Sequence, residues 1–134
     1  MPDLTITDSA IIPVSGFTPF DGTAGATTTA GLACYLDAAA LTIKIADNDT
    51  SSATATVKGI SLHAALAGQP LRLIIGGSLG MGAILTAGVF YYLGEDGGIC
   101  PVADLASPEW VSLIGYGSTT SNLVLSIVNT GVAL

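Results

Sequence analysis

His63 is the only histidine of the chain, so it is the first residue to consider for catalysis. A serine–histidine–aspartate triad would have to use it as the general base. It lies within Ile60-Ser61-Leu62-His63-Ala64-Ala65, and no Gly-x-Ser-x-Gly nucleophile motif is near it. We therefore interpret His63 as a loop or surface residue.

Acidic residues raise the possibility of a calcium site. Asp47, Asp49 and Ser51 have the spacing with which a calcium-binding loop begins. Such a loop needs glycine at its sixth position and glutamate at its twelfth, where this chain has Ser52 and Lys58. We interpret residues 47–52 as a polar turn.

The remaining chemical motifs are incomplete. Glycoside hydrolysis needs two paired carboxyl groups, but the ten acidic residues are scattered through expected turns. The glycine-rich stretches at 80–82 and 94–98 lack the Lys-Ser/Thr that completes a phosphate-binding loop. We expect no enzymatic activity, no cofactor and no metal site.

Charge is scarce: three Lys and Arg and ten Asp and Glu make up 10% of 134 residues, with a net charge of −7. A surface suited to solitary solubility carries about 25–35% charged residues, so we expect protein partners to cover much of this one. Nucleic-acid binding is excluded, because only Lys44, Lys58 and Arg72 could meet phosphates. Disorder is excluded by the 50% hydrophobic content.

The termini and cysteines predict the compartment. The N-terminal residues lack the basic start and apolar segment of a secretory signal, so we expect synthesis and assembly in the cytoplasm. Cys34 and Cys100 lie among apolar residues, and we expect both to be buried and reduced.

Residues 73–94 carry no charge and are long enough to span a bilayer. Gly76 and Gly80 even have the small-xxx-small spacing of membrane helix pairs. However, this stretch contains six glycines, and each one disfavours a helix. We expect no membrane span, but a strand, a glycine-rich junction and a second strand.

An internal repeat organises the chain. Residues 29–36 match residues 86–93 at an offset of 57, and residues 45–47 match 102–104 at the same offset. Residues 57–59 match 113–115 at an offset of 56, and Leu71, Leu73 and Ile75 match Leu123, Leu125 and Ile127 at an offset of 52. The sequence therefore predicts two copies, at about 22–76 and 79–128.

Strand-forming residues dominate both copies. The sequence predicts an all-β fold, a small β-barrel or sandwich built from two pseudo-repeated β units with an extended N-terminal arm. Strands are expected at 10–14, 32–36, 41–46, 54–61, 71–75, 89–93, 110–117 and 122–128, with a hairpin turn at 95–98 and helical turns at 62–67 and from Ser107. Residues 1–21 form the arm and first strand, and residues 22–134 form one domain.

Aromatic and apolar residues suggest where partners bind. Strand alternation places Phe90 and Tyr92 on the face opposite Tyr91. These two side chains could be core against the other copy, a contact between subunits or a sugar-stacking platform. The candidate partner-contact residues are Leu4, Ile6, Phe17, Phe20, Phe90 and Tyr92.

Short turn and strand motifs along nearly the whole chain carry a family resemblance. They are Asp3-Leu4-Thr5-Ile6-Thr7, Gly22-Thr23-Ala24-Gly25-Ala26, Thr29-Ala30-Gly31, Tyr35-Leu36-Asp37, Lys44-Ile45-Ala46-Asp47, Val57-Lys58-Gly59-Ile60-Ser61-Leu62, Ala67-Gly68-Gln69-Pro70, Thr86-Ala87-Gly88, Tyr92-Leu93 and Gly97-Gly98-Ile99-Cys100-Pro101. The sequence resembles the low-charge capsid decoration, or cement, proteins of tailed bacteriophages.

This resemblance implies a β-rich subunit, often trimeric, that binds the outer face of an assembled phage head. The partner would be the major capsid protein, the location would be the capsid exterior of the virion, and the family offers no catalytic residues to carry over. An alternative remains open, a trimeric phage tail or fibre-associated receptor-binding module that binds host glycans through exposed tyrosine or tryptophan.

Overall fold

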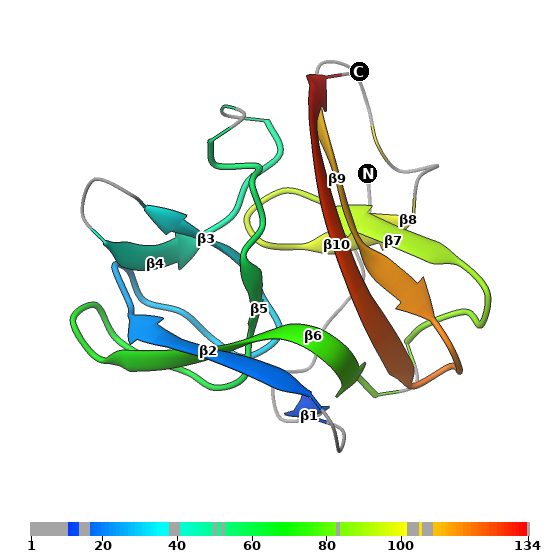
Figure 1. The fold of residues 1–134 in the computed structure, drawn as a ribbon, viewed down its shortest axis with the longest axis horizontal. Coiled ribbons are helices and arrows are strands. Elements are labelled where there is room, and N and C mark those ends of the chain that lie inside the picture. The colour runs from blue at the N-terminus through cyan, green and yellow to red at the C-terminus, as the bar shows by residue number, and fades with distance from the viewer. Residues whose placement is uncertain are drawn as a thin grey trace.

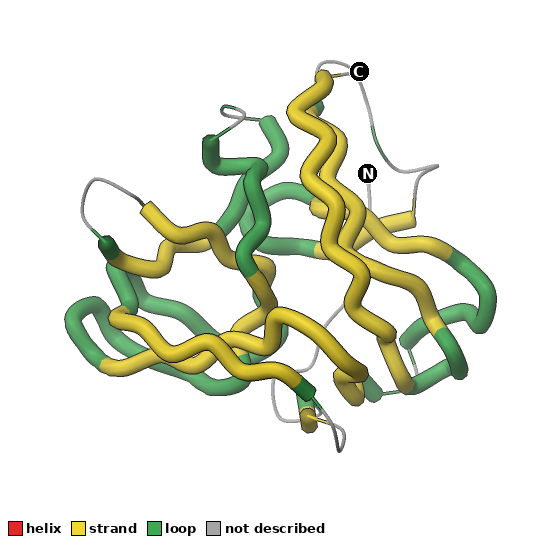
Figure 2. Tube along the Cα trace, viewed as in Figure 1, coloured by secondary structure: helices red, strands yellow, loops and turns green. Residues whose placement is uncertain are grey.

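The described part of the chain consists of strands and loops (Figure 2). A computed structural model describes residues 11–13, 17–37, 41–49, 51, 53–82, 84–101, 105 and 109–133. In these residues it shows ten strands and no helix, and every paired strand is antiparallel to its partner. The predicted all-β class is confirmed.

Two curled sheets share one long strand (Figure 1). What we call the first unit contains β2 (Thr18–Thr23), β3 (Ala33–Asp37), β4 (Thr42–Ile45), β5 (Gly59–Ser61) and the beginning of β6 (Pro70–Gly80). The second unit contains the end of β6 with β7 (Phe90–Leu93), β8 (Ile99–Pro101), β9 (Trp110–Gly117) and β10 (Asn122–Ala133). The short β1 (Ile12–Pro13) pairs with the end of β6.

The first unit curls back on itself. β2 pairs with β6 from Thr23↔Pro70 to Thr18↔Gly76, while a parallel bridge joins Ala24, just after β2, to β4. The strand order β4-β3-β5-β6 thus approaches closure through β2. A small cluster of buried side chains, including Ile43 and Leu73, fills this unit.

Strand register relates the two units at the offsets read in the sequence. Ala33 pairs with Ile60 in the first unit, and Phe90 pairs with Tyr116 in the second, at offsets of 57 and 56. The strand order β4-β3-β5-β6 is likewise followed by its counterpart β10-β9-β7-β8 in reverse.

In the second unit, the end of β6 occupies the position that β2 occupies in the first unit. The pair Thr23↔Pro70 corresponds to Gly80↔Asn122, at offsets of 57 and 52. One strand therefore closes the first unit and opens the second.

Matching turns precede β3 and β7. Gly31 and Gly88 end the two Thr-Ala-Gly motifs with φ of 88° and 82°, a left-handed conformation that glycine adopts without steric cost. Each donates its amide to a carbonyl of the adjacent strand at 2.8 Å, Gly31 to Ser61 and Gly88 to Gly117. The repeated motif thus encodes a repeated turn.

A larger buried cluster joins the two units. Ala33, Ile60 and Ile74 come from the first unit, and Leu93 and Ile114 are among the residues from the second. All five are fully buried. The units therefore share one apolar core.

The helical turn predicted at 62–67 is wrong. Ala65 instead bridges Thr28, donating its amide at 2.9 Å and accepting the Thr28 amide at 2.8 Å. Six residues cannot sustain a helix alone, so the pairing with the distant segment around Thr28 determines the conformation instead. The turn expected from Ser107 falls on residues 106–108, outside the described residues.

Several strand boundaries differ from the prediction. In the stretch 54–61 only Gly59–Ser61 is a strand, because Thr54 and Ala55 lie in a turn. β6 runs five residues past the predicted end at Ile75, and β10 continues past Val128 to Ala133. Both extensions lie opposite partner strands, which local composition does not reveal.

The predicted N-terminal arm is in part a sheet element. Residues 12–13 form β1 and residues 18–21 belong to β2, both paired with β6. Pro19 and the Asp21-Gly22 pair suggest a turn, but proline is tolerated where a strand has a free edge. Residues 1–10 and 14–16, including Leu4 and Ile6, lie outside the described residues.

The uncharged stretch 73–94 contains most of β6, a junction and β7, as its strand–junction–strand pattern predicts. Within the described residues, no helix is long and apolar enough to cross a membrane.

Two glycines at corresponding positions lie where strands approach closely. A Cβ on Gly59 would lie 2.5 Å from the Ile74 carbonyl oxygen, and one on Gly115 would overlap the Val124 carbonyl. We expect Gly59→Ala and Gly115→Ala each to lower the free energy of unfolding by about 1–3 kcal/mol, as overpacking does, measured by urea denaturation.

The matched control is Gly76→Ala in β6, where the nearest atom, Thr18 Oγ1, would lie 3.5 Å from the new Cβ. It should change the free energy of unfolding much less. Equal losses in all three variants would contradict the close approach at Gly59 and Gly115.

Candidate interaction surface

Phe90 and Tyr92 lie on the outer face of the second unit. Tyr91, between them, points into the core and is 3% exposed, whereas Phe90 is 53% exposed and Tyr92 is half-buried. Phe90 is paired across the strands with Tyr116, and their rings meet edge to face with centroids 5.8 Å apart. Phe90 is therefore a surface residue and not part of a core between the copies.

The register extends this outer face over β9 and β10. Tyr116 lies opposite Val124, Leu113 opposite Val128, and Val111 opposite Val132. We call the resulting surface the apolar face, and its members are Phe90, Tyr92, Val111, Leu113, Tyr116, Val124, Val128 and Val132.

The composition of the apolar face is that of a protein contact. No charged residue occurs in β7, β9 or β10, and Val128 and Val132 are 51% and 59% exposed. Contiguous exposed apolar surface is uncommon on monomeric proteins, and interface centres are depleted of charge and enriched in aromatic side chains. The apolar face is therefore the strongest candidate binding surface in the described residues.

The other candidate contact residues lie elsewhere. Phe17 is half-buried against the larger core cluster. Phe20 is half-buried beneath Lys58, whose Nζ is 4.7 Å from the ring centroid. Of the six candidates, the structure brings together Phe90 and Tyr92, while Leu4 and Ile6 fall outside the described residues.

Sequence reasoning missed the rest of the apolar face. The repeat offsets relate Phe90 to Ala33 and Tyr116 to Ile60, but the pairing of Phe90 with Tyr116 could not have been found from the offsets alone. Val128 and Val132 could not either, because two register shifts in β10 decide which of its side chains face outward.

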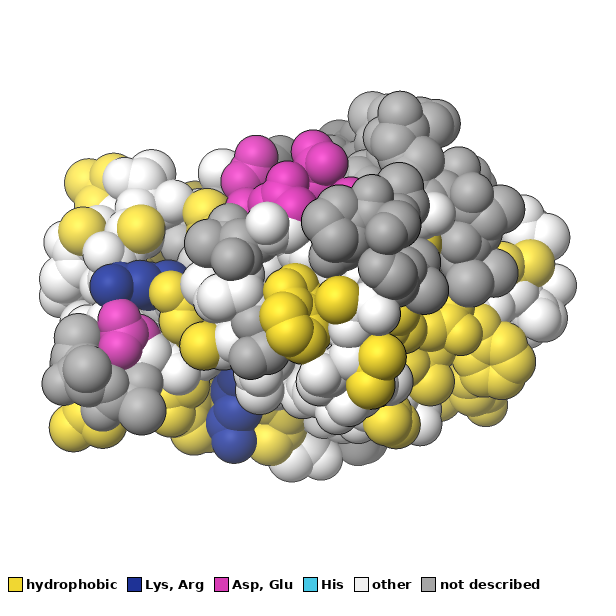
Figure 3. Space-filling model, turned by 90° about the horizontal axis from the view of Figure 1, so that it is seen from above, with side chains coloured by type: hydrophobic (Ala, Val, Ile, Leu, Met, Phe, Trp, Pro, Cys, Tyr) yellow, Lys and Arg dark blue, Asp and Glu magenta, His cyan; other side chains and the backbone are white. Residues whose placement is uncertain are grey.

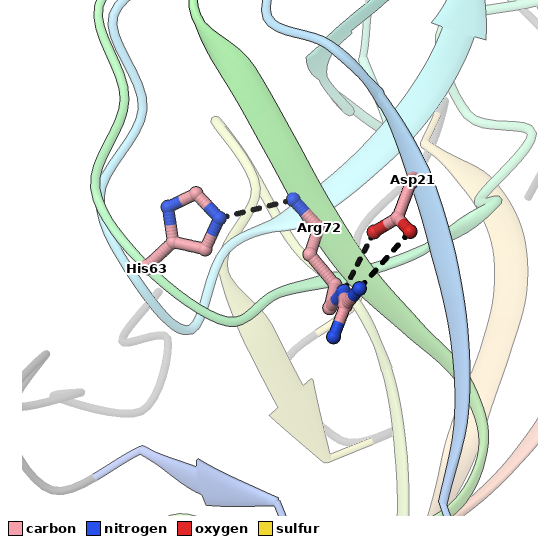
Figure 4. Close-up of polar contacts among 3 residues, drawn as sticks. All are labelled: Asp21, His63 and Arg72. Carbon is pink, nitrogen blue, oxygen red and sulfur yellow. Dashed lines mark hydrogen bonds and ion pairs between the residues drawn. The ribbon is translucent and has the colours of Figure 1, made fainter.

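His63 is hydrogen-bonded to the backbone at both ring nitrogens, and Figure 4 shows the bond to the Arg72 amide. Its Nε2 accepts the Arg72 amide at 3.1 Å, so the proton of the neutral ring is on Nδ1, which lies 2.9 Å from the Ala64 carbonyl oxygen. The histidine thus connects its loop to β6.

The neighbouring carboxylate is directed to arginine. Arg72 donates from Nε and Nη2 to the two carboxylate oxygens of Asp21, at 2.6 and 3.1 Å. The Arg72 guanidinium holds the pKa of Asp21 below its ordinary value. Asp21, His63 and Arg72 therefore form structural contacts between β2, β6 and the 62–65 loop, and the carboxylate does not orient the imidazole as a triad would (Figure 4).

Acidic side chains gather on another surface (Figure 3). A hydrogen bond with Asp47 and the charges of Asp47, Asp96 and Glu109 raise the pKa of Asp49. The segment around Asp47 is a polar turn, in which the Thr54 hydroxyl donates to the Asp47 carbonyl at 3.1 Å. Among the described residues, no group of His, Cys, Asp and Glu side chains is arranged to hold a metal ion.

Both cysteines are buried and neither forms a disulfide, as the sequence predicts. Burial raises the pKa of the Cys34 thiol to about 12, so the reactive thiolate is scarce at neutral pH. Cys34 thus acts as a small apolar side chain in the first unit.

The sequence matches no protein-family model and no curated protein.

The acidic surface predicts a pH-dependent stability. Because its carboxyl neighbours raise the pKa of Asp49 above 3.8, the ionised form is disfavoured in the folded protein and destabilises it at neutral pH. Asp49→Asn should raise the thermal unfolding midpoint at neutral pH. The gain should vanish as the pH falls below the raised pKa and then below 3.8, where Asp49 is protonated in both states.

Asp21→Asn is the control of opposite sign. Arg72 lowers the pKa of Asp21, so this substitution should lower the midpoint at neutral pH and lose its effect in acid. A decrease for Asp49→Asn at neutral pH would contradict the repulsion among these carboxylates.

Proposed function

We propose that this chain is a virion structural protein, a capsid decoration subunit on the outer surface of a tailed-phage head. The observation that carries the proposal is the apolar face: a broad, uncharged, aromatic-containing surface on an all-β domain. Such a surface serves protein contact. The motif resemblance supplies the kind of assembly.

The physical requirements of decoration agree with this surface chemistry. Binding to a shell requires complementary area, about 800 Å² on each partner for a standard interface, and no catalytic group. A net charge of −7 with three basic residues also gives the subunit little affinity for the packaged genome. The proposed partners are the major capsid protein and further copies of the chain, with a trimer favoured.

Two regions would divide these contacts. We assign the shell contact to the N-terminal residues that include Leu4 and Ile6, and a contact between subunits to the apolar face with Phe90 and Tyr92. The first assignment rests on the alternation of apolar and polar residues in Asp3-Leu4-Thr5-Ile6-Thr7.

Cryo-electron microscopy of the virion tests the proposal directly. We expect density that accommodates this chain on the exterior of the head, at repeated positions where capsid subunits adjoin. Purified protein should also co-sediment with emptied heads that lack it. Absence of the chain from the shell in both experiments would refute the proposal.

Deletion of residues 1–7 tests the shell contact. We expect at least a tenfold loss of binding to emptied heads, with an unchanged thermal unfolding midpoint, because these residues serve the partner and not the fold. The control is Leu66→Asp, which changes a leucine that is 59% exposed on the first unit and should bind normally. If the truncated protein unfolds, the segment belongs to the core and the assignment fails.

A receptor-binding module of a phage tail or fibre is the second candidate. The exposed edge-to-face pair of Phe90 and Tyr116 favours it, since aromatic rings stack on sugars. A glycan array probed with wild type and with Phe90→Ser distinguishes the two. Sugar binding that the substitution abolishes supports this candidate, and a blank array with the protein on heads rejects it.

A further inference from the structure

We propose that the apolar face binds the first unit of another copy of this chain, repeating the contact that the second unit makes with the first inside the chain. The inference rests on the proposed role of this face as a protein contact, but it does not depend on binding to a phage head.

Corresponding side chains define the same face on each unit. Phe90 and Tyr116 occupy in the second unit the cross-strand pair that Ala33 and Ile60 occupy in the first. The register is the same at these two pairs, so these four residues occupy corresponding positions on the two units.

Inside the chain, the second unit covers this face of the first. Ala33 and Ile60 are both 0% exposed and share a core cluster with Leu93. The turn between β7 and β8 lies directly against Ala33: the Ala33 amide donates to the Gly97 carbonyl at 2.9 Å, and the Gly97 amide donates to the Ala46 carbonyl at 2.6 Å. The covering element is thus the β7–β8 hairpin.

A buried amide reinforces the same contact. Asn48, in the loop after β4, is 1% exposed, and its Nδ2 donates to the Leu93 carbonyl at 3.0 Å. The Trp110 amide in turn donates to the Asn48 carbonyl at 2.7 Å. The packing of one unit on the next is therefore specific as well as apolar.

On the second unit the same face has no such cover. Phe90 is 53% exposed and Tyr116 is 37% exposed. Phe90 and Tyr116 have aromatic rings at the positions where the first unit has Ala33 and Ile60. The apolar face therefore has more apolar area to bury than the corresponding face of the first unit. A third unit would cover the apolar face, and the described residues form two.

The first unit has an exposed hairpin that could cover the apolar face of another copy. There the β3–β4 hairpin corresponds to the covering β7–β8 hairpin, and Leu36 corresponds to Leu93 at the offset of 57. Leu93 is 0% exposed, whereas Leu36 is 38% exposed and Leu41, in the same hairpin, is 73% exposed. The second unit therefore has the apolar face with no hairpin packed on it. The first unit has the β3–β4 hairpin, which covers no such face within the chain.

Charge does not oppose this contact. The apolar face is uncharged, and the cation on the β3–β4 hairpin, Lys44, is neutralised by Asp37 at 2.8 Å. Burying the two surfaces together leaves no unpaired charge from these strands, which would be costly.

A head-to-tail contact of this kind uses two different surfaces. Each copy then binds one neighbour by its face and another by its hairpin, so copies form a closed ring if the rotation permits and an open chain otherwise. A two-fold contact, in contrast, would bury the apolar face against itself and leave the hairpin unused.

Complementary variants separate these arrangements. Phe90→Asp places a charge in the apolar face and should disable it, and Leu41→Asp does the same on the β3–β4 hairpin. Leu66→Asp is the matched control, because it adds an equal charge at an exposed leucine outside both surfaces. Aspartate also tolerates the left-handed conformation of residue 41, whose φ is 56°. Circular dichroism establishes that each variant folds, and Tyr116→Asp and Leu36→Asp replace any that does not.

Light scattering coupled to size-exclusion chromatography gives the mass of each sample. We expect wild type and Leu66→Asp to form oligomers, and each of the other two variants alone to be monomeric. An equimolar mixture of Phe90→Asp and Leu41→Asp should form dimers and stop there, because one intact face meets one intact hairpin and the remaining surfaces are both disabled.

Other outcomes overturn the proposal. Wild type that is monomeric at every concentration excludes self-association, and oligomers that Phe90→Asp dissolves but Leu41→Asp leaves intact indicate a two-fold contact of the face. Binding to emptied heads is measured separately. A monomer found on heads rejects this inference and spares the proposed function, and an oligomer absent from heads does the reverse.

Discussion

The whole structure depends on β6 pairing with strands of both units. Its first part, up to Gly76, pairs with β2 and β5, and its end pairs with β10 and β1. Gly77, with φ of 88°, marks the passage from one sheet to the other in a conformation that few other residues adopt. Because the strand is continuous, the position of one unit dictates that of the other, and their joint core follows from it.

The repeat produces two similar units with different surroundings. Small residues such as Ala33 occur where a neighbouring unit lies close, and large aromatic residues such as Phe90 occur at the corresponding position that faces solvent. The sequence thus differs between the copies where their environments differ. The sequence is the same in both copies where a turn requires the same backbone conformation, as at Gly31 and Gly88.

Much of the fold could be predicted, because strands, turns and the repeat leave local signals. Period-two alternation correctly placed Phe90 on the face opposite Tyr91, and the Thr-Ala-Gly motifs identified corresponding turns. β2 was missed because Pro19 and Gly22 suggest a turn, whereas pairing with β6 decides the outcome. Likewise, the extent of the apolar face depends on register shifts in β10, and no local pattern specifies a shift between distant strands.

The shared strand has a consequence for synthesis on the ribosome. Residues that complete the first unit have all been made once Gly76 is added, but the end of β6 waits for its partner Asn122, about 40 residues later. At about 5–20 residues per second, translation leaves that edge unpaired for several seconds. Three of the last five residues of β6 are glycines, which pair weakly in sheets. In the nascent chain, the unpaired edge at the end of β6 therefore has little tendency to pair with a wrong strand.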